Sequence, residues 1–223
     1  MALTGYHTGM GPNPPFALNS GEIQVLLGSL LGDGSIPAPP VLPPGRHHNC
    51  WFSEGHCIAQ EAYLRWKATQ LRRLGPQVRT RPGRSSNVIS LRTRRWPMLT
   101  ELRGIFYPQG KKIVPKDKIW ELGLEGLAVW WMDDGSYHQQ HRNGRLCTQG
   151  FTKEDNRWLA EHFFPKQFGL EPRVTPVRRR IKGVVSGGFN FYLWFSKGET
   201  KKLVELLKSL IHPTLRYKLG FAT

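Results

Sequence analysis

Two aspartates, Asp33 and Asp134, each end a long apolar stretch and are each followed by a glycine and a serine. The first stretch is Ile23–Ile36 (IQVLLGSLLGDGSI) and the second is Leu124–Tyr137 (LEGLAVWWMDDGSY). An aspartate at the C-terminus of an apolar helix opposes the helix dipole, which costs up to about 1 kcal/mol. A single Asp-Gly-Ser is usually only a turn. Two copies, about 100 residues apart, indicate an internal repeat with a chemical purpose.

The pair of carboxylates predicts a metal site. If the two apolar stretches are helices that pack in parallel, their ends bring the aspartates side by side, and like charges so close need a cation between them. Mg²⁺ is the usual partner of carboxylates and phosphates, with Mn²⁺ or Ca²⁺ as substitutes for binding. Carboxylates, Mg²⁺ and a basic surface together indicate phosphodiester hydrolysis by metal-activated water.

The composition favours a nucleic-acid partner. Lys and Arg number 32 against 16 Asp and Glu, which gives a formal net charge of +16 in 223 residues. Such an excess favours a polyanion, because each Lys or Arg that neutralises a phosphate releases counterions. A membrane is not expected as a partner, since the chain shows no basic amphipathic helix and no apolar run of membrane-spanning length.

The three cysteines, Cys50, Cys57 and Cys147, are widely spaced and form no Cys-x-x-Cys pair. We therefore expect free thiols in a reducing compartment rather than zinc or a disulfide framework. No secretory signal is recognisable at the start of the sequence. The expected location is intracellular, in an organelle (chloroplast or mitochondrion) or in bacterial cytoplasm.

The order of elements predicts two similar halves with an αββαββα pattern and an α+β fold. We expect a flexible arm at 1–20, a first half at 21–115, a linker at 116–123 and a second half at 124–223. The first half is predicted to contain helices at 21–32, 60–74 and 96–107, and strands at 49–58, 77–82 and 87–93. The second is predicted to contain helices at 124–134, 152–168 and 199–211, and strands at 145–151, 173–180 and 189–195.

A basic sheet face is predicted in the first half. Eight arginines and no acid lie between residues 72 and 95. The pairs Arg79/Arg81 and Arg92/Arg94 occupy alternate positions of predicted strands, so each pair should project from one face. An ordinary solvated face is the alternative, but the absence of any acid favours a DNA-binding face.

Two segments resemble the motifs of a known family. Leu26–Gly34 (LLGSLLGDG) and Leu127–Gly135 (LAVWWMDDG) are similar to the two motifs of a LAGLIDADG homing endonuclease, of the single-chain kind encoded in group I introns. Gly110–Pro115 (GKKIVP) and Leu215–Leu219 (LRYKL) resemble the segments that carry the active-site lysines of that family. The resemblance covers roughly Gly21–Leu219.

The resemblance implies catalytic roles for four residues. Asp33 and Asp134, the last aspartates of the two motifs, would bind the divalent metal and help to activate water. Lys112 and Lys218 would order solvent or stabilise the developing charge.

The residue before each catalytic aspartate, Gly32 or Asp133, is included in the expected metal site. Asp133 and Asp134 could be confused as metal ligands. The alignment to Gly135 favours Asp134 and leaves the role of Asp133 open.

The family also implies a curved antiparallel sheet in each half, the two halves joined at a two-helix interface. Each sheet would fill the major groove of one half-site in a long asymmetric DNA target, and cleavage across the minor groove would give a staggered double-strand break. The side chains expected to contact DNA are basic: Arg46, His48, Arg79, Arg81, Arg84, Arg92, Arg94, Arg95, His138, Arg142, Arg145, Arg173, Arg178, Arg180 and Lys182.

We expect a monomer that acts on double-stranded DNA. The alternative is an RNA-binding maturase on the same scaffold, whose partner would be its own intron RNA. Asp33 and Asp134 favour cleavage, because a pure maturase can lose them. A transcription regulator on this scaffold would need an added helix-turn-helix domain.

Overall fold

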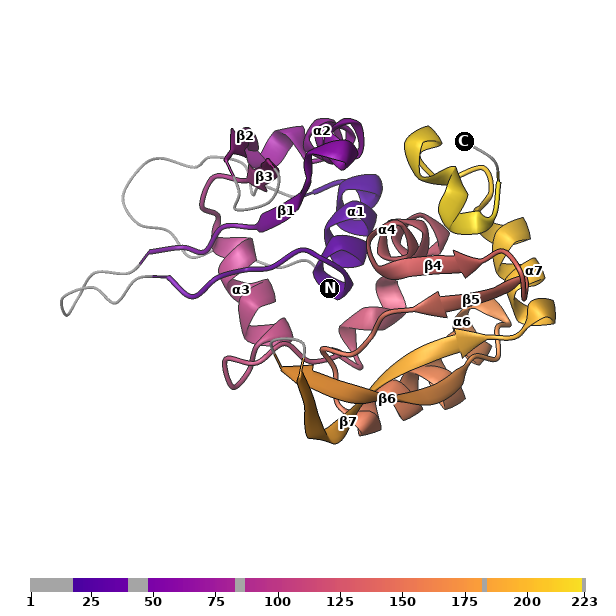
Figure 1. The fold of residues 1–223 in the computed structure, drawn as a ribbon. Helices are drawn as coiled ribbons and strands as arrows, with labels where there is room; N and C mark the ends of the chain where they lie inside the picture. The colour runs from indigo at the N-terminus through magenta and orange to yellow at the C-terminus, as the bar shows by residue number, and fades with distance from the viewer. Residues whose placement is uncertain (1–17, 40–47, 83–86, 182–183, 222–223) are drawn as a thin grey trace.

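A computed structural model describes residues 18–39, 48–82, 87–181 and 184–221 (Figure 1). In the first half, helices alternate with one strand or with a pair of strands. They are α1 (Ser20–Leu31), β1 (Ser53–Cys57), α2 (Glu61–Gln70), β2 (Gln77–Arg81), β3 (Val88–Arg92) and α3 (Pro97–Phe106).

The second half begins with α4, after a short 3-10 turn at Lys118–Glu121. A 3-10 segment, Pro213–Leu219, follows its last helix. The elements between are α4 (Leu124–Asp134), β4 (Gly135–His138), β5 (Asn143–Leu146), α5 (Lys153–Trp158), a π-helical turn (Leu159–Phe163), α6 (Phe164–Phe168), β6 (Arg173–Ile181), β7 (Val184–Phe195) and α7 (Lys197–Leu207).

Each half contributes one antiparallel sheet, and the sheets lie on either side of the central helices α1 and α4 (Figure 1). The strand orders are β1-β3-β2 and β4-β5-β7-β6. The predicted α+β fold of two αβ halves around two helices is confirmed. The first half departs from the predicted αββαββα pattern, because its sheet has three strands in the described residues and Ser35 forms only an isolated bridge with Ser53 of β1. In the described ranges no helix combines the length and apolarity needed to cross a bilayer.

Helices α1 and α4 pack in parallel. Near their starts, the Gln24 side chain accepts a hydrogen bond from the Gly123 amide at 2.7 Å and donates one to the Glu121 carbonyl at 2.7 Å. Near their ends, Gly32 lies against Asp133, since a Cβ placed on Gly32 would be 2.6 Å from the Asp133 Cβ. Contacts at matching ends require the helices to run in the same direction, so both carry their aspartates to one place.

Small residues allow these helices to approach closely. A Cβ on Gly28 of α1 would overlap the Gly126 carbonyl of α4 and lie 2.8 Å from the Val129 Cβ. Trp130 and Trp131, predicted to pack in the core, are fully buried and anchor α4 among aromatic side chains of the second half. Close approach of the two backbones therefore depends on glycine, and the surrounding core on large apolar side chains.

Gly28→Ala is expected to lower the free energy of unfolding by about 1–3 kcal/mol, because an added methyl group at a packed interface forces neighbouring atoms apart. Gly104→Ala is the matched control, since a Cβ on this α3 glycine would meet no atom within 4 Å. The control should gain stability by roughly 0.5–1 kcal/mol from helix propensity. Urea unfolding followed by circular dichroism measures both, and equal stability of the two variants would contradict the packing argument.

The helix predicted at 152–168 begins as expected, with a capping box between Thr152 and Asp155. It is not a uniform α-helix, because Leu159–Phe163 adopts a π-helical turn. Pro165 explains the interruption: it has no N–H to donate to the carbonyl four residues earlier. Helix α1 also begins one residue earlier than predicted, with Asn19 as its N-cap in a capping box with Glu22.

Candidate active site

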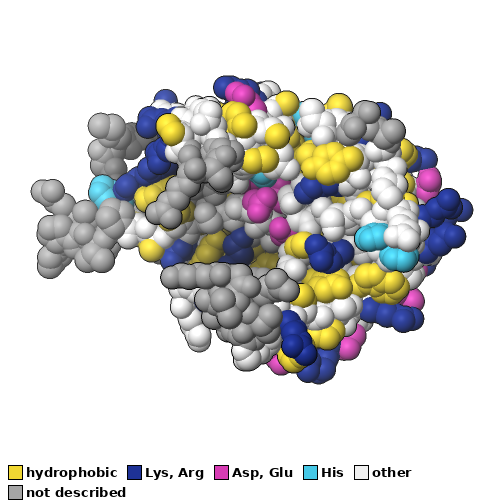
Figure 2. All heavy atoms as spheres, in the orientation of Figure 1, with side chains coloured by type: hydrophobic (Ala, Val, Ile, Leu, Met, Phe, Trp, Pro, Cys, Tyr) yellow, Lys and Arg dark blue, Asp and Glu magenta, His cyan; other side chains and the backbone are white. Residues whose placement is uncertain are grey.

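The two aspartates of the repeat lie at the ends of the paired helices. Asp33 follows the C-cap residue of α1, and its side chain is 42% exposed. Asp134 is the last residue of α4 and is half-buried. Burial, together with the negative charges of Asp33 and Asp133, raises the pKa of Asp134 to about 7, against the opposing effect of Lys112 and Lys218. The ends of α1 and α4 thus form an acidic centre, visible between Lys and Arg side chains in Figure 2.

One lysine from each half is bound at the end of its helix. Lys112 Nζ donates hydrogen bonds to the Gly32 carbonyl at 3.0 Å and the Gly34 carbonyl at 2.7 Å. Lys218 Nζ donates to the carbonyls of Met132 at 2.5 Å and Asp133 at 2.8 Å. Free carbonyls at a helix C-terminus attract cations. The two halves therefore place the same kind of group at equivalent positions.

Burial lowers the pKa of both lysines, and the aspartates around them offset only part of this effect. Lys218 is held further by its own backbone, because its carbonyl accepts a hydrogen bond from the Trp131 indole at 2.9 Å. Both ammonium groups thus have fixed positions beside the acidic centre. Lys111, next to Lys112, is exposed and takes no part in this arrangement.

Asp133 belongs to a buried network. Its carboxylate accepts hydrogen bonds from Lys67 Nζ at 2.7 and 2.8 Å and from the Tyr63 hydroxyl at 2.8 Å. Lys67 Nζ also contacts Glu54, whose carboxylate pairs with His56 Nε2 at 2.6 Å. The Lys67 side chain is fully buried. Burial alone would lower the pKa of Lys67, but Asp133 and Glu54 outweigh it and the net shift is upward, so Lys67 remains an ammonium group.

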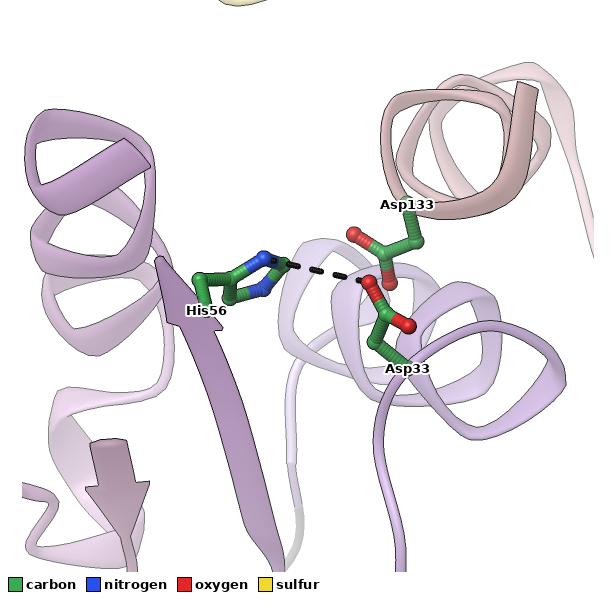
Figure 3. A group of neighbouring side chains, drawn as sticks. All are labelled: Asp33, His56 and Asp133. Atoms are coloured by element: carbon green, nitrogen blue, oxygen red, sulfur yellow. Dashed lines mark ion pairs between the residues drawn. The ribbon is translucent and has the colours of Figure 1, made fainter. Parts of the chain in front are cut away.

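His56 connects this network to the acidic centre. Its Nδ1 lies 3.8 Å from Asp33 Oδ2 and 2.8 Å from the Gln60 side-chain oxygen (Figure 3). Burial lowers the pKa of His56, but its hydrogen bond and charge interaction with Glu54 produce a net upward shift. The histidine is therefore engaged at both ring nitrogens.

Two sets of residues could hold a divalent cation. Among the described residues, Asp33, His56 and Asp133 place one ligand atom each within 4.8 Å of one another. Within that set, His56 and Asp133 already take part in hydrogen bonds, and Asp133 is also paired with Lys67. The Asp33 carboxylate has a looser contact, with His56 Nδ1 at 3.8 Å. The other set is Asp33 with Asp134, and it suits a cation, because burial and the negative charges of Asp33 and Asp133 raise the pKa of Asp134 and a bound cation would counter both effects.

The residues before the two aspartates are not equivalent as metal ligands. The Asp133 side chain is paired with Lys67, so this structure gives it a different role from the predicted metal ligand. Gly32 has no side chain and could offer only its carbonyl, which already accepts one hydrogen bond from Lys112.

The first sheet presents arginines on the face opposite this network. Strand pairing places Arg92 across from Gln77 on one side and Ser53 on the other, with Arg79 and Arg81 at alternate positions of β2. All three arginines are exposed, and they share one face because side chains alternate along a strand. Arg92 stacks on the Trp51 ring, with its guanidinium carbon 4.0 Å from the ring centroid.

The second sheet has a corresponding face. Arg145 of β5 pairs with Trp194 of β7, which pairs with Arg173 of β6, so both arginines lie on one face. His138 of β4 shares this face by register and is exposed. Arg142 lies in the turn between β4 and β5 and is exposed, with a backbone φ of 51°.

Three further arginines that are expected to contact DNA do not occupy strand positions of these faces. Arg94 is beyond the end of β3, and its side chain packs over Gly75. Arg95, also beyond the strand, has its guanidinium carbon 4.9 Å from the Trp51 centroid. Arg178 pairs with Phe189, which places it on the face opposite Arg145. The prediction that Arg94 projects with Arg92 from one strand face is wrong, because β3 ends at Arg92.

Five further side chains are expected to contact DNA. His48 is exposed. Arg180 lies in β6, but its side chain is outside the description. Arg46, Arg84 and Lys182 lie outside the described residues.

Comparison with known proteins identifies the family. The sequence model of the LAGLIDADG DNA endonuclease family matches residues 23–203. The chain belongs to this family. Among curated relatives, RecA from Mycobacterium shimoidei is 31% identical over 218 residues, which cover 92% of this chain and 48% of that protein. The probable intron-encoded DNA endonuclease 3 of Mycosarcoma maydis is 37% identical over 94 residues, or 42% of this chain and 61% of the relative. The chain thus spans about half the length of the RecA proteins that it matches.

Solved structures of homing endonucleases share the fold. I-WcaI, bound to its DNA recognition sequence, superposes with a TM-score of 0.74 at 20% identity and covers 96% of both chains. A variant of I-DmoI, in complex with its target DNA and in the presence of Mn, has a TM-score of 0.51 at 13% identity and covers 87% of this chain and 98% of that one. These likenesses place the LAGLIDADG chain among two-sheet homing-endonuclease folds.

Four residues of the buried network in this LAGLIDADG chain were not predicted as site residues from sequence: Lys67, Glu54, His56 and Tyr63. One signal was present: Lys67 follows Tyr63 by one helical turn, on the face of α2 that carries the apolar residues. A charged residue at a core position needs a buried partner. A second signal was the alternation of Glu54 and His56, which puts two polar side chains on one face of β1.

Proposed function

We propose that this chain is a site-specific endonuclease that cuts both strands of a long asymmetric DNA target by hydrolysing one phosphodiester bond in each. The proposal rests above all on the matched arrangement at the ends of α1 and α4. There Asp33 stands with Lys112, and Asp134 with Lys218, in two halves that share one centre. Two equivalent sets of groups suit two scissile phosphates and a staggered break.

The sheet faces support DNA as the substrate. Exposed arginines lie on the same face in each sheet, and a formal charge of +16 favours a polyanion. The homologous homing endonuclease I-WcaI was solved bound to its DNA recognition sequence. Because the halves differ in sequence, one copy of the chain would read two different half-sites, so the proposed enzyme acts as a monomer on an asymmetric target.

Asp33 and Asp134 would hold Mg²⁺, which when bound supplies a Lewis acid and a water of lowered pKa. The structure of the I-DmoI variant in complex with its target DNA, in the presence of Mn, supports a divalent ion in this role. Lys112 and Lys218 keep a positive charge beside each carboxylate and stabilise the negative charge that develops on the phosphate. Their bonds to helix-end carbonyls fix them before substrate arrives, which avoids reorganisation during the reaction.

The experiment that tests the proposal is cleavage of a randomised DNA library with Mg²⁺, followed by sequencing of the ends. We expect one long asymmetric sequence, cut on both strands with a constant stagger. A library left intact with Mg²⁺ and with Mn²⁺ would contradict the proposal. Binding of a structured intron RNA in place of DNA would instead support the maturase alternative.

Lys112→Met and Lys218→Met are each expected to slow cleavage by roughly 10- to 100-fold, with a smaller effect on DNA binding. The loss follows from removal of a fixed charge beside the reacting phosphate. Single-turnover cleavage rates and gel-shift affinities separate the two effects. Lys111→Met is the matched control, because this neighbouring lysine is exposed. An equal loss of rate in the control would show that Lys112 contributes only to the general charge.

A further inference from the structure

The last turn of α4 is held by a buried ion pair that comes from the other half of the molecule. Lys67 lies on α2 of the first half, and its Nζ contacts both carboxylate oxygens of Asp133 on α4 at 2.7 and 2.8 Å. Neither side chain is exposed to solvent. Tyr63, one turn before Lys67 on the same helix, donates a third hydrogen bond to Asp133 at 2.8 Å. A carboxylate that accepts three hydrogen bonds from two side chains of one helix has a fixed position.

The hydrogen-bonded anchor is at the end of α4, whereas Asp33 meets the same network through a longer contact, with His56 Nδ1 at 3.8 Å. The residue before Asp33 is Gly32, which has no side chain, and a Cβ at that position would be 2.7 Å from Asp133 Oδ2. The carboxylate of Asp133 therefore fills the space that a side chain at Gly32 would need. The ends of the two helices are alike in their lysine contacts and different in this one anchor.

The anchor acts directly next to the proposed catalytic residue. Asp133 is the neighbour of Asp134 in the chain, and its carbonyl is also held, by Lys218 Nζ at 2.8 Å. The carbonyl of Asp134 accepts a hydrogen bond from the Cys147 amide at 3.0 Å. With its side chain and carbonyl both bound, Asp133 has little freedom to rotate, and so the backbone that carries Asp134 is fixed as well.

We propose that Lys67 is a positioning residue for Asp134: through its buried ion pair with Asp133, the first half fixes the catalytic carboxylate of the second. The inference rests on the proposed endonuclease function. Its consequence is that the two strands are cut by centres with unequal support. Loss of the ion pair should slow the strand served by Asp134 more than the strand served by Asp33.

The test compares variants of the full chain that separate positioning from stability. Lys67→Met alone leaves Asp133 buried without its cation, which is strongly destabilising. The double variant Lys67→Met/Asp133→Asn removes both charges of the pair and leaves Glu54 paired with His56, so it should recover part of the lost stability. Tyr63→Phe is the milder change, because it removes one donor to Asp133 and keeps every charge. Asn156→Ala is the matched control for stability, since this buried side chain bonds Thr148 within the second half.

Three measurements are made on each variant: thermal unfolding, DNA affinity without divalent cation, and single-turnover cleavage of each labelled strand with Mg²⁺. We expect the double variant to cleave roughly 10- to 100-fold more slowly on one strand, with a smaller loss on the other. Tyr63→Phe should show the same difference in cleavage rate between the two strands, with a smaller loss of rate. Amides in the last turn of α4 should exchange with solvent faster in both, and DNA affinity should change little.

The outcome that overturns the inference is cleavage that follows stability alone. This outcome would be seen if the double variant cut both strands at the wild-type rate. It would also be seen if cleavage of the two strands slowed equally, as is expected for Asn156→Ala. Should the double variant fail to fold, Tyr63→Phe decides the question by its strand ratio and by the exchange of α4. Wild-type protein is assayed in parallel, and a wild type that cuts no DNA contradicts the proposed function. In that case, amide exchange in the last turn of α4, compared between each variant and wild type, still tests the anchor.

Discussion

Asp33→Asn and Asp134→Asn are each expected to abolish double-strand cleavage and to leave DNA binding largely intact. The loss of rate should be about 10³-fold or more, because each carboxylate stands where charge develops in the reaction. Binding should survive, since the arginines of the two sheet faces supply the phosphate contacts and neither aspartate lies on those faces. An amide keeps the size of the carboxylate, so the helix ends need not repack.

A supercoiled plasmid that carries the target site measures this prediction. Wild type should convert it to linear DNA, and the variants should leave it supercoiled or nicked, with gel-shift affinity close to wild type. Asp117→Asn is the control, because this acid is exposed and lies outside the centre. Complete linearisation by both aspartate variants would contradict the assignment.

The same Asp134→Asn change is expected to stabilise the metal-free protein at neutral and alkaline pH. The pKa of Asp134 is raised from 3.8 to about 7, mainly by burial and by the charges of Asp33 and Asp133. The folded state thus binds the Asp134 proton more tightly than the unfolded state does. Wild-type stability should fall as pH rises from about 4 to about 7, and this cost should be constant above that range.

The size of the stability difference follows from the shift. One pKa unit corresponds to about 1.4 kcal/mol, so the variant should gain on the order of 2–4 kcal/mol at pH 8 and little at pH 4. Thermal unfolding in the presence of a chelator, at a series of pH values, measures this gain. A gain independent of pH would contradict the electrostatic argument. Mg²⁺ should raise the melting temperature of wild type more at pH 8 than at pH 6, because protons compete for the same carboxylate, and should affect Asp134→Asn less.

Much of the fold was predictable because its signals are local. Helices α1 and α4 follow from apolar runs closed by Asp-Gly, and β2 and β3 were located within one residue at each end. Arg79, Arg81 and Arg92 were placed correctly on one face because alternation along a strand is a local property. The prediction failed for Arg94, because β3 ends at Arg92 and the Arg94 side chain packs over Gly75.

The sequence by itself determined the repeat and the two aspartates, because each is marked by residues within a few positions. The resemblance of two segments to the LAGLIDADG family indicated Lys112 and Lys218. Only the tertiary structure decided the role of Asp133. Its cation, Lys67, is 66 residues distant and reaches it by the packing of α2 against the end of α4. A buried charge can be recognised from sequence as needing a partner, but which partner it meets depends on how the helices are arranged in space.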